Sequence, residues 1–398
     1  MISARLLKGG DPVNWGEIIA LTGADPGSLP RLGRRDRITV ILLEGLPSPA
    51  ASILKQCMLS GGADALVHKD VLTCGVSVSS AAVYGTPRAI ARGCESMAGQ
   101  PFSLGDTAAV VMKLLQDPDL PPSITIDGAV LEYRGTPLIM GIINATPDSF
   151  SDGGSYSSPE AAADMACRMA EQGAALVDVG GESTRPGSGW VSGEEQISRV
   201  IPVISAIRER CGVPVSVDTR LPEVARAAVA AGAGMINSVN ALESPGMADA
   251  AAELGVPVCL MHMLGTPDTM QDDPEYTNVI DEVGEYLLKA VERAVAAGVR
   301  KERILVDPGI GFGKRLQDNL ALLGSLEHLK RHTGCRVLLG HSRKSFLKAI
   351  TGIEDPGERD CVTHIVSVLA RGADMVRVHD VAGSSSAFAV ADALGVMR

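Results

Sequence analysis

The chain has 398 residues, which is longer than one typical domain and predicts two domains or one large barrel with an extension. Hydrophobic residues make up 45% and charged residues 21%, a balance that excludes a disordered chain and is typical of a globular α/β protein. Lys and Arg total 36 against 47 Asp and Glu, and no long Lys/Arg run interrupts the net charge of −11. We therefore expect small-molecule partners and no binding to nucleic acid or to anionic membranes.

The first residues, MISARLLKGGDPVNWG, lack the apolar stretch of roughly 7 to 15 residues that a signal peptide needs. No segment offers the roughly 18 consecutive apolar residues of a membrane span. The eight cysteines are scattered without a CxxC pair, which argues against a disulfide framework. These features predict a cytoplasmic protein.

The N-terminal third is predicted to form a separate, smaller α/β domain. It contains a strand-like run at 38–43 and a helical stretch at 49–59. A Pro/Asp-rich stretch, QDPDLPPS, precedes the rest of the chain and marks a boundary. We therefore predict domains at 1–128 and 129–398. No motif in the first domain indicates its role.

The second domain alternates short apolar runs with Ala-rich helical stretches. Runs that are polar on neither face are typical of buried parallel strands. Eight such units in roughly 250 residues predict a (β/α)₈ TIM barrel, although a doubly wound open sheet gives the same alternation. The eight runs are 138–143, 176–179, 213–217, 235–237, 256–261, 304–306, 337–339 and 375–378.

Polar residues follow these runs directly, and their placement favours the barrel. In a barrel all strand ends converge on one face, whereas an open sheet gathers only those beside its switch point. The polar positions are Asn144, 180–185, Asp218, Asn237, His262, Asp307, 341–344 and 377–380.

Several of the strand-end loops carry recognisable motifs: MGIINATPDSFSDGG, DVGGESTRPGS, SVDTR, LMHM, DPGIGFGK, SRKSF and RVHDV. Together, in this order over roughly 137–398, they resemble dihydropteroate synthase. The resemblance implies condensation of 6-hydroxymethyl-7,8-dihydropterin diphosphate with p-aminobenzoate, giving dihydropteroate and diphosphate in folate biosynthesis. It also implies a homodimer.

The resemblance implies a pterin site at three strand ends. The pterin edge carries amide and amino donors, which need fixed acceptors when they are buried. Asp218, Asn237 and Asp307 fit that role, and Lys344 is implied as a further pterin contact.

The leaving diphosphate calls for groups that stabilise developing negative charge. The resemblance assigns this site to Asn144, Ser342, Arg377 and His379. It also implies Mg²⁺ on Asn144, with Asp148 or Asp152 nearby, because this ion prefers oxygen ligands.

The arylamine site should contain a planar slot and a partner for the carboxylate of the arylamine. The resemblance assigns Thr184, Pro186, Phe312 and Ser345 to p-aminobenzoate. The residues expected to take part in catalysis are Asp148, Asp152, Arg185 and Lys344. No covalent protein nucleophile is needed.

Some features leave alternatives open. His262 fits either a site residue or a packed structural histidine, and Ser238 and His341 depart from the pattern usual in the family. The GIGFGK segment does not meet the P-loop pattern, because position 308 is Pro and position 315 is Arg. Two rival functions remain: a corrinoid-dependent methyltransferase on the same type of barrel, and a non-catalytic pterin-binding protein.

Overall fold

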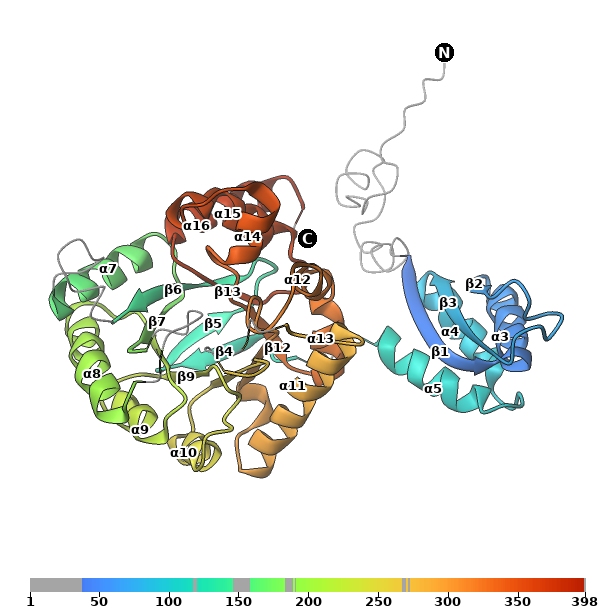
Figure 1. The fold of residues 1–398 in the computed structure, drawn as a ribbon, viewed down its shortest axis with the longest axis horizontal. Coiled ribbons are helices and arrows are strands. Elements are labelled where there is room, and N and C mark those ends of the chain that lie inside the picture. The colour runs from blue at the N-terminus through green and yellow to red at the C-terminus, as the bar shows by residue number, and fades with distance from the viewer. Residues whose placement is uncertain are drawn as a thin grey trace, which may run out of the picture. The chain divides into compact units, whose positions relative to one another are not determined.

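A computed structural model describes residues 38–116, 120–145, 158–182, 189, 191–266, 270 and 273–396. The chain forms two compact units, Met1–Asp117 and Pro118–Arg398, and each is described by itself (Figure 1). None of the helices in the described ranges combines the length and apolarity that crossing a membrane requires.

Unit 1 is a small α/β structure, as predicted for the N-terminal part of the chain. Its three-stranded sheet has the order β1-β3-β2, with β3 antiparallel to both neighbours. Helices and sheet share one apolar core that includes Leu54, Ile90 and Val83. Its elements are β1 (Thr39–Pro47), α3 (Ser48–Gly61), β2 (Asp64–Val67), β3 (Val78–Gly85), α4 (Pro87–Met97) and α5 (Leu104–Leu115).

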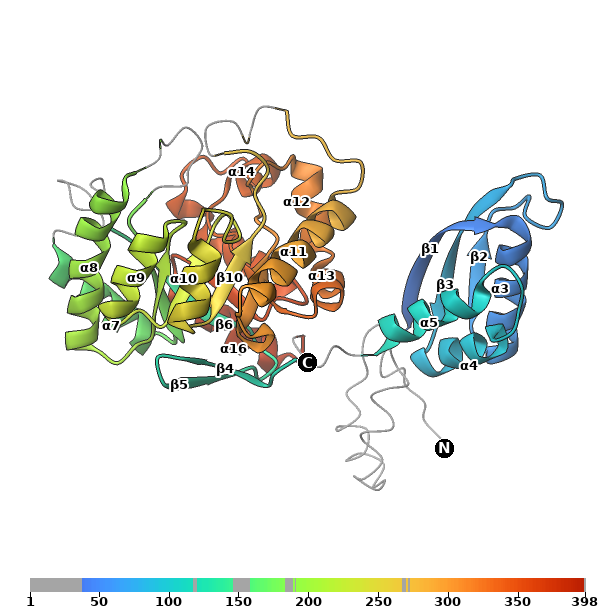
Figure 2. The same ribbon diagram turned by 90° about the horizontal axis from the view of Figure 1, so that it is seen from below.

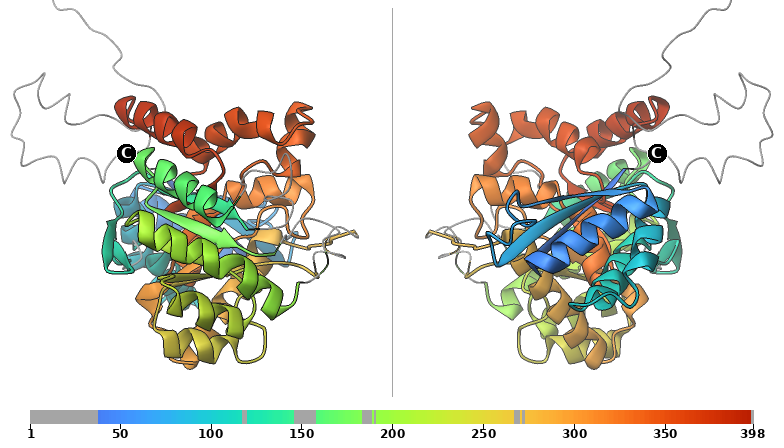
Figure 3. Two further views of the ribbon diagram at one scale, coloured as in Figure 1. Left: turned by 90° about the vertical axis from the view of Figure 1, so that its left-hand side faces the viewer. Right: turned by 90° about the vertical axis from the view of Figure 1, so that its right-hand side faces the viewer.

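Unit 2 is a closed barrel of eight parallel strands in the order β6 to β13, so the predicted TIM barrel is confirmed and the open sheet is excluded. Helices surround the strands (Figures 1 and 3). The strands are β6 (Leu138–Asn144), β7 (Leu176–Gly180), β8 (Val215–Asp218), β9 (Met235–Ser238), β10 (Val258–Met261), β11 (Ile304–Asp307), β12 (Arg336–Leu339) and β13 (Met375–Val378).

The outer helices begin and end at the signals that the sequence offers. Ser158 caps α7 by accepting a hydrogen bond from the Ala161 N–H, and Asn278 caps α11 in the same way. The helices are α7 (Pro159–Glu171), α8 (Gly193–Arg210), α9 (Pro222–Ala230), α10 (Met247–Leu254), α11 (Val279–Ala296), α12 (Leu316–Leu323), α13 (Leu326–Thr333), α14 (Ser345–Thr351), α15 (Asp360–Leu369) and α16 (Val381–Ala393), with 3₁₀ turns at η2 (Lys301–Arg303) and η3 (Gly357–Arg359).

A β-hairpin of β4 (Ser123–Ile126) and β5 (Ala129–Glu132) lies across one end of the barrel, opposite α14 (Figure 2). Its Asp-Gly turn has positive φ at both residues, as a two-residue hairpin turn requires. Ile124 and Ile126 pack against inward-facing strand residues. The boundary predicted between 128 and 129 therefore falls inside a turn of unit 2.

Candidate active site

The candidate site follows from the alternation of side chains along the strands. Inward-facing residues of β7, β9, β11 and β13 form an apolar layer: Leu176, Met235, Leu305 and Met375. Two residues further along the same strands, and therefore on the same inner face, stand Asp178, Asn237, Asp307 and Arg377. Layers of four side chains from alternate strands are typical of this fold. We call these last four residues the polar layer.

Arg377 links three residues of the site. Its Nε donates to Asp178 Oδ2 at 2.6 Å, and its Nη2 donates to Asp218 Oδ2 at 2.8 Å. Asp178 Oδ2 also accepts from Asn237 Nδ2 at 3.0 Å. Burial raises the pKa of Asp218 to about 7, although the neighbouring Arg377 opposes the rise. Residues that are far apart in sequence are thus held in one hydrogen-bonded network.

Lys344 lies beside this network, next to Asp307. Its Nζ donates to Ile310 O at 2.5 Å and stands 4.2 Å from the centre of the Phe312 ring. Burial lowers the pKa of Lys344 to about 8, while Asp307 acts in the opposite direction. Burial also raises the pKa of Asp307, against the effect of Lys344. The site therefore combines buried acids, Asp178 and Asp307, with half-buried cations.

Glycines allow the DPGIGFGK loop to approach these residues closely. Gly309 has φ +66°, and a Cβ there would lie 1.9 Å from His262 O. Gly311 has φ +83°, and a Cβ there would lie 3.2 Å from Lys344 Cδ. Glycine is needed at both positions, because it adopts the left-handed conformation and leaves room for the neighbouring atoms.

The residues predicted to hold diphosphate lie at three strand ends. Ser342 Oγ and His379 Nδ1 are 2.9 Å apart, and the His379 N–H also donates to Ser342 Oγ at 3.3 Å. Asn144 ends β6 and pairs in register with Gly180. Ser342 and His379 are thus brought together, while Arg377 belongs to the polar layer.

Two of the residues predicted for p-aminobenzoate lie in the described part of the chain. Phe312 is buried in an apolar cluster with Val239, Met261 and Met270. Ser345 is the exposed first residue of α14. Five of the predicted site residues lie outside the described residues: Asp148, Asp152, Thr184, Arg185 and Pro186.

Sequence reasoning missed two buried polar residues. Asp178 lies within a strand and not after it, so the polar residues that follow the strands do not include it, yet a single acid within an apolar strand is itself a signal. Lys314 donates to Phe312 O at 3.0 Å and lies 2.8 Å from His262 Nδ1, and burial lowers its pKa to about 7. His262 also packs edge-on against Tyr286, 4.8 Å between ring centres.

The two departures from the family pattern serve local packing. Ser238 Oγ accepts from the Leu242 N–H at 3.0 Å and thereby stabilises the turn after β9. His341 is fully buried, with Nε2 2.9 Å from Ser367 Oγ on α15. Both residues therefore contact the surrounding scaffold.

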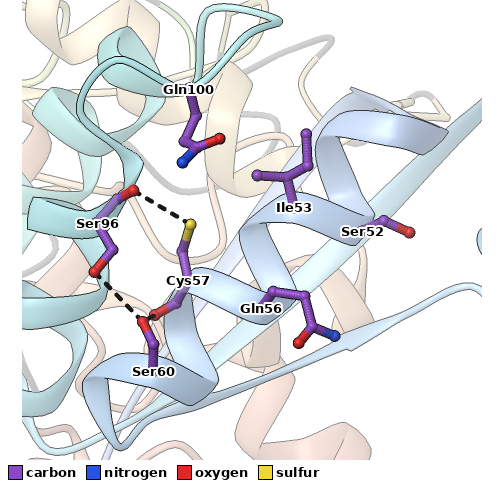
Figure 4. Close-up of a pocket in the computed structure, with 7 residues that line it drawn as sticks. All are labelled: Ser52, Ile53, Gln56, Cys57, Ser60, Ser96 and Gln100. Carbon is purple, nitrogen blue, oxygen red and sulfur yellow. Dashed lines mark hydrogen bonds between the residues drawn. The ribbon is translucent and has the colours of Figure 1, made fainter.

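A groove between α3 and α4 in unit 1, with a volume of about 440 Å³, has a different character (Figure 4). Its lining side chains are neutral, and three of them, Cys57, Ser60 and Ser96, bond to one another or to the backbone. Cys57 Sγ donates to Ser96 O at 3.5 Å, and Ser60 Oγ lies 3.4 Å from Ser96 Oγ. The charged groups that chemistry on a diphosphate needs lie in unit 2.

Comparisons with known proteins agree with this placement. The profile of the pterin-binding enzyme family matches residues 140–379. Dihydropteroate synthase of Escherichia coli K12 is 47% identical over 259 residues, which are 65% of this chain and 91% of that protein. The enzyme of Synechocystis is 42% identical over 277 residues, which are 69% of this chain and 96% of that one.

Solved structures lead to the same family. The dihydropteroate synthase of Xanthomonas albilineans, solved with 4-aminobenzoic acid, has a TM-score of 0.64 and 48% identity, covering 69% of this chain and 98% of that one. The same enzyme in complex with 7,8-dihydropteroate has a TM-score of 0.62 and 46% identity, covering 69% and 99%. The resemblance drawn from the motifs is confirmed: the chain belongs to the pterin-binding enzyme family, and its barrel is that of a dihydropteroate synthase.

Proposed function

We propose that the chain condenses 6-hydroxymethyl-7,8-dihydropterin diphosphate with p-aminobenzoate, releasing 7,8-dihydropteroate and diphosphate. The observation that carries this proposal is the convergence of three polar acceptors and two half-buried cations at the C-terminal end of the barrel. Asp218, Asn237 and Asp307 present the oxygens, and Arg377 and Lys344 the positive charge. A pterin diphosphate needs both kinds of group.

The three acceptors recognise the pterin ring by hydrogen bonding. Its ring edge offers N–H donors, and a buried donor left unpaired costs about 1–3 kcal/mol. Asp307 lies at the end of β11, fixed by the Gly309 N–H at 2.7 Å, and Asn237 is fixed by Asp178. Preset acceptors favour the pterin over analogues that lack these donors.

The cations and hydroxyls stabilise the departing diphosphate. Arg377 and Lys344 supply charge, and Ser342 and His379 supply further donors from adjacent strand ends. As the bond between the pterin methylene and oxygen breaks, its electron pair leaves with the diphosphate. The amine of p-aminobenzoate attacks the methylene carbon and releases one proton to the diphosphate or to water. Groups already held in place stabilise the growing negative charge without reorganisation.

Mg²⁺ fits the same end of the barrel. The ion favours oxygen ligands and is typically held by one or two protein groups, substrate phosphates and water. The amide oxygen of Asn144, half-buried at the end of β6, is such a ligand. When bound, the ion would neutralise charge on the diphosphate. Asp148 and Asp152 are proposed as neighbouring carboxylates, and both lie outside the described residues.

The arylamine enters beside Phe312 and Lys344. Phe312 supplies a ring face, and Lys344 Nζ lies above it. Ser345, the first residue of α14, is proposed to bind the p-aminobenzoate carboxylate. Thr184, Arg185 and Pro186 are proposed to complete this slot and to act in catalysis, together with Asp148, Asp152 and Lys344.

A homodimer is also proposed, through α15 and α16. Four large apolar side chains on these packed helices, or directly after α16, are exposed in the single chain: Ile365, Leu369, Val390 and Leu394. Exposed patches of this kind favour association between copies. Light scattering on Leu369→Glu should then report a monomer, and a dimer in that variant would place the interface elsewhere.

We further propose a cytoplasmic location. All eight cysteines lie within the described ranges as free thiols, a state that a reducing compartment maintains. Fractionation of cells that produce the protein would test this.

The activity is tested by mixing the purified chain with Mg²⁺, the dihydropterin diphosphate and p-aminobenzoate, omitting each in turn. Dihydropteroate should appear only when both substrates are present and should be lost in Arg377→Ala. Pterin binding without any product would instead favour a non-catalytic binding protein.

A further inference from the structure

Asp178 is a buried acid for which the proposed reaction has no step. Its side chain is fully buried inside the barrel, in the polar layer. One oxygen, Oδ2, accepts two hydrogen bonds, from Arg377 Nε and from Asn237 Nδ2. The other, Oδ1, has no hydrogen-bond partner in the described part of the chain. A half-satisfied buried carboxylate is costly, so its presence calls for an explanation.

The two donors come from opposite sides of Asp178 in the barrel. Asp178 stands on β7, Asn237 on β9 and Arg377 on β13, and one strand separates β7 from each of the other two. The strand hydrogen bonds therefore do not fix these side chains relative to one another. Asp178 fixes the side chains of Asn237 and Arg377 directly, by accepting a hydrogen bond from each.

The chemistry of the carboxylate also determines how Asn237 is oriented. An ionised carboxylate only accepts hydrogen bonds, so the amide nitrogen of Asn237 must face Asp178. Its Oδ1 then points elsewhere and is available as an acceptor. Without this contact the amide could turn over and present a donor to the donor edge of the pterin.

We propose that Asp178 is a positioning residue for pterin recognition: it fixes the amide of Asn237 with its oxygen available to the ring and holds the guanidinium of Arg377 beside it. This inference rests on the proposed function, because it takes the pterin as the ligand. Asp178 acts through its neighbours and need not touch the substrate.

Two substitutions separate positioning from charge. Asp178→Asn removes the charge but keeps an oxygen that can accept both bonds, whereas Asp178→Ala removes charge and acceptor together. Positioning predicts that affinity for 6-hydroxymethyl-7,8-dihydropterin falls at most about threefold in Asp178→Asn and more than about tenfold in Asp178→Ala. Equal losses in both variants would overturn the proposal.

Inorganic diphosphate provides an internal check on the site. Both variants relieve Arg377 of one neighbouring negative charge and leave its bond to Asp218 in place, so neither should bind diphosphate more weakly. If Asp178→Ala lost pterin and diphosphate binding together, the site would have collapsed as a whole and the positioning role would be wrong. Calorimetry measures both affinities without turnover, so a missing synthase activity would not hide the result.

Asp374 offers a matched control. It is a buried carboxylate that accepts from Arg336 Nη1 at 2.7 Å, where β13 begins and away from the polar layer. Asp374→Asn and Asp374→Ala should lower the melting temperature and leave pterin affinity unchanged. If Asp178→Ala does not fold, Asp178→Leu fills the volume without an acceptor, and normal pterin binding by that variant would overturn the proposal.

A double-substitution cycle completes the test. In an Asn237→Ala background, the difference in pterin affinity between Asp178→Asn and Asp178→Ala should shrink to about twofold or less, because the amide to be oriented is gone. A difference that persists at full size would show that Asp178 acts by another route.

Discussion

Lys344 is a proposed site residue whose charge depends on pH. Burial lowers the pKa of its ammonium from 10.5 to about 8, so the charged form is complete only below that value. We expect kcat/KM for the dihydropterin diphosphate to fall as pH rises through about 8. In Lys344→Arg the fall should disappear, even if the rate is lower, because guanidinium does not titrate there. A wild-type profile that stays flat to pH 9.5 would contradict this.

Asp218 makes the free energy of unfolding depend on pH. Its pKa rises from 3.8 to about 7 on folding, so the folded chain binds the proton more tightly than the unfolded chain. This contribution is complete below about pH 4 and is lost as pH rises through about 7. We expect Asp218→Asn to reduce the difference in unfolding free energy between pH 4 and pH 8 by up to about 4 kcal/mol. Denaturant titration at both pH values measures it, and an unaltered difference would refute the shift.

The polar layer and the neighbouring Asp218 show which site residues can be predicted from the sequence and which cannot. Asp218, Asn237, Asp307 and Arg377 were predicted because each stands at the end of an apolar run. Asp178 was missed, although the two-residue period of a strand would have placed it on the same inner face. The Arg377 contacts could not be predicted, because they depend on which strands lie across the barrel from one another.

At the scale of elements, the DPGIGFGK loop depends on glycine. Gly309→Ala would meet both a left-handed φ and a Cβ 1.9 Å from His262 O, so we expect a loss of at least about 2 kcal/mol in stability and weaker substrate binding. Gly324→Ala is the control, since Gly324 has φ −76° and its Cβ would meet nothing closer than 3.6 Å. Thermal unfolding of the two variants should differ clearly; similar melting temperatures would contradict the argument.

The β4–β5 hairpin offers a substitution that should stabilise the protein. Tyr133 follows it, and its hydroxyl is buried without a hydrogen-bond partner in the described ranges, while Arg336 lies 4.0 Å from the ring centre. Tyr133→Phe keeps the ring and should raise the unfolding free energy by up to about 1 kcal/mol. Tyr276→Phe, which loses a 2.8 Å bond to Gly313 O, should lower it. Destabilisation by both changes would count against this account of Tyr133.

Elements differ in how far sequence could predict them. The eight barrel strands were found because their apolar runs are buried on both sides. The hairpin was not, although its Asp-Gly turn is a known signal. Its strands are buried on one face at most, so they contain no continuous apolar run. Their stability comes from contact with the barrel interior, which the pattern along the chain does not reveal.

At the scale of the whole molecule, the two units have separate cores, so unit 2 is expected to fold alone. A chain of residues 118–398 should keep its synthase activity within about twofold. A chain beginning at residue 134 loses the hairpin and Tyr133, uncovers Met140 and Leu176, and should be less stable by several kcal/mol. Activity assays and thermal unfolding compare them, and an inactive 118–398 chain would assign unit 1 a part in catalysis.

The stacking of the polar layer on an apolar one has a consequence for engineering. Met235 and Asn237 share a strand, yet one helps to seal the barrel and the other lies among the proposed ligand-binding groups. Enzymes often trade stability against turnover because strained, polar sites cannot be repacked freely. Here, substitutions in the apolar layer and the hairpin would change heat resistance, whereas substitutions in the polar layer, two residues further along the same strands, would change catalytic rate. One barrel can therefore adapt to temperature and to substrate separately.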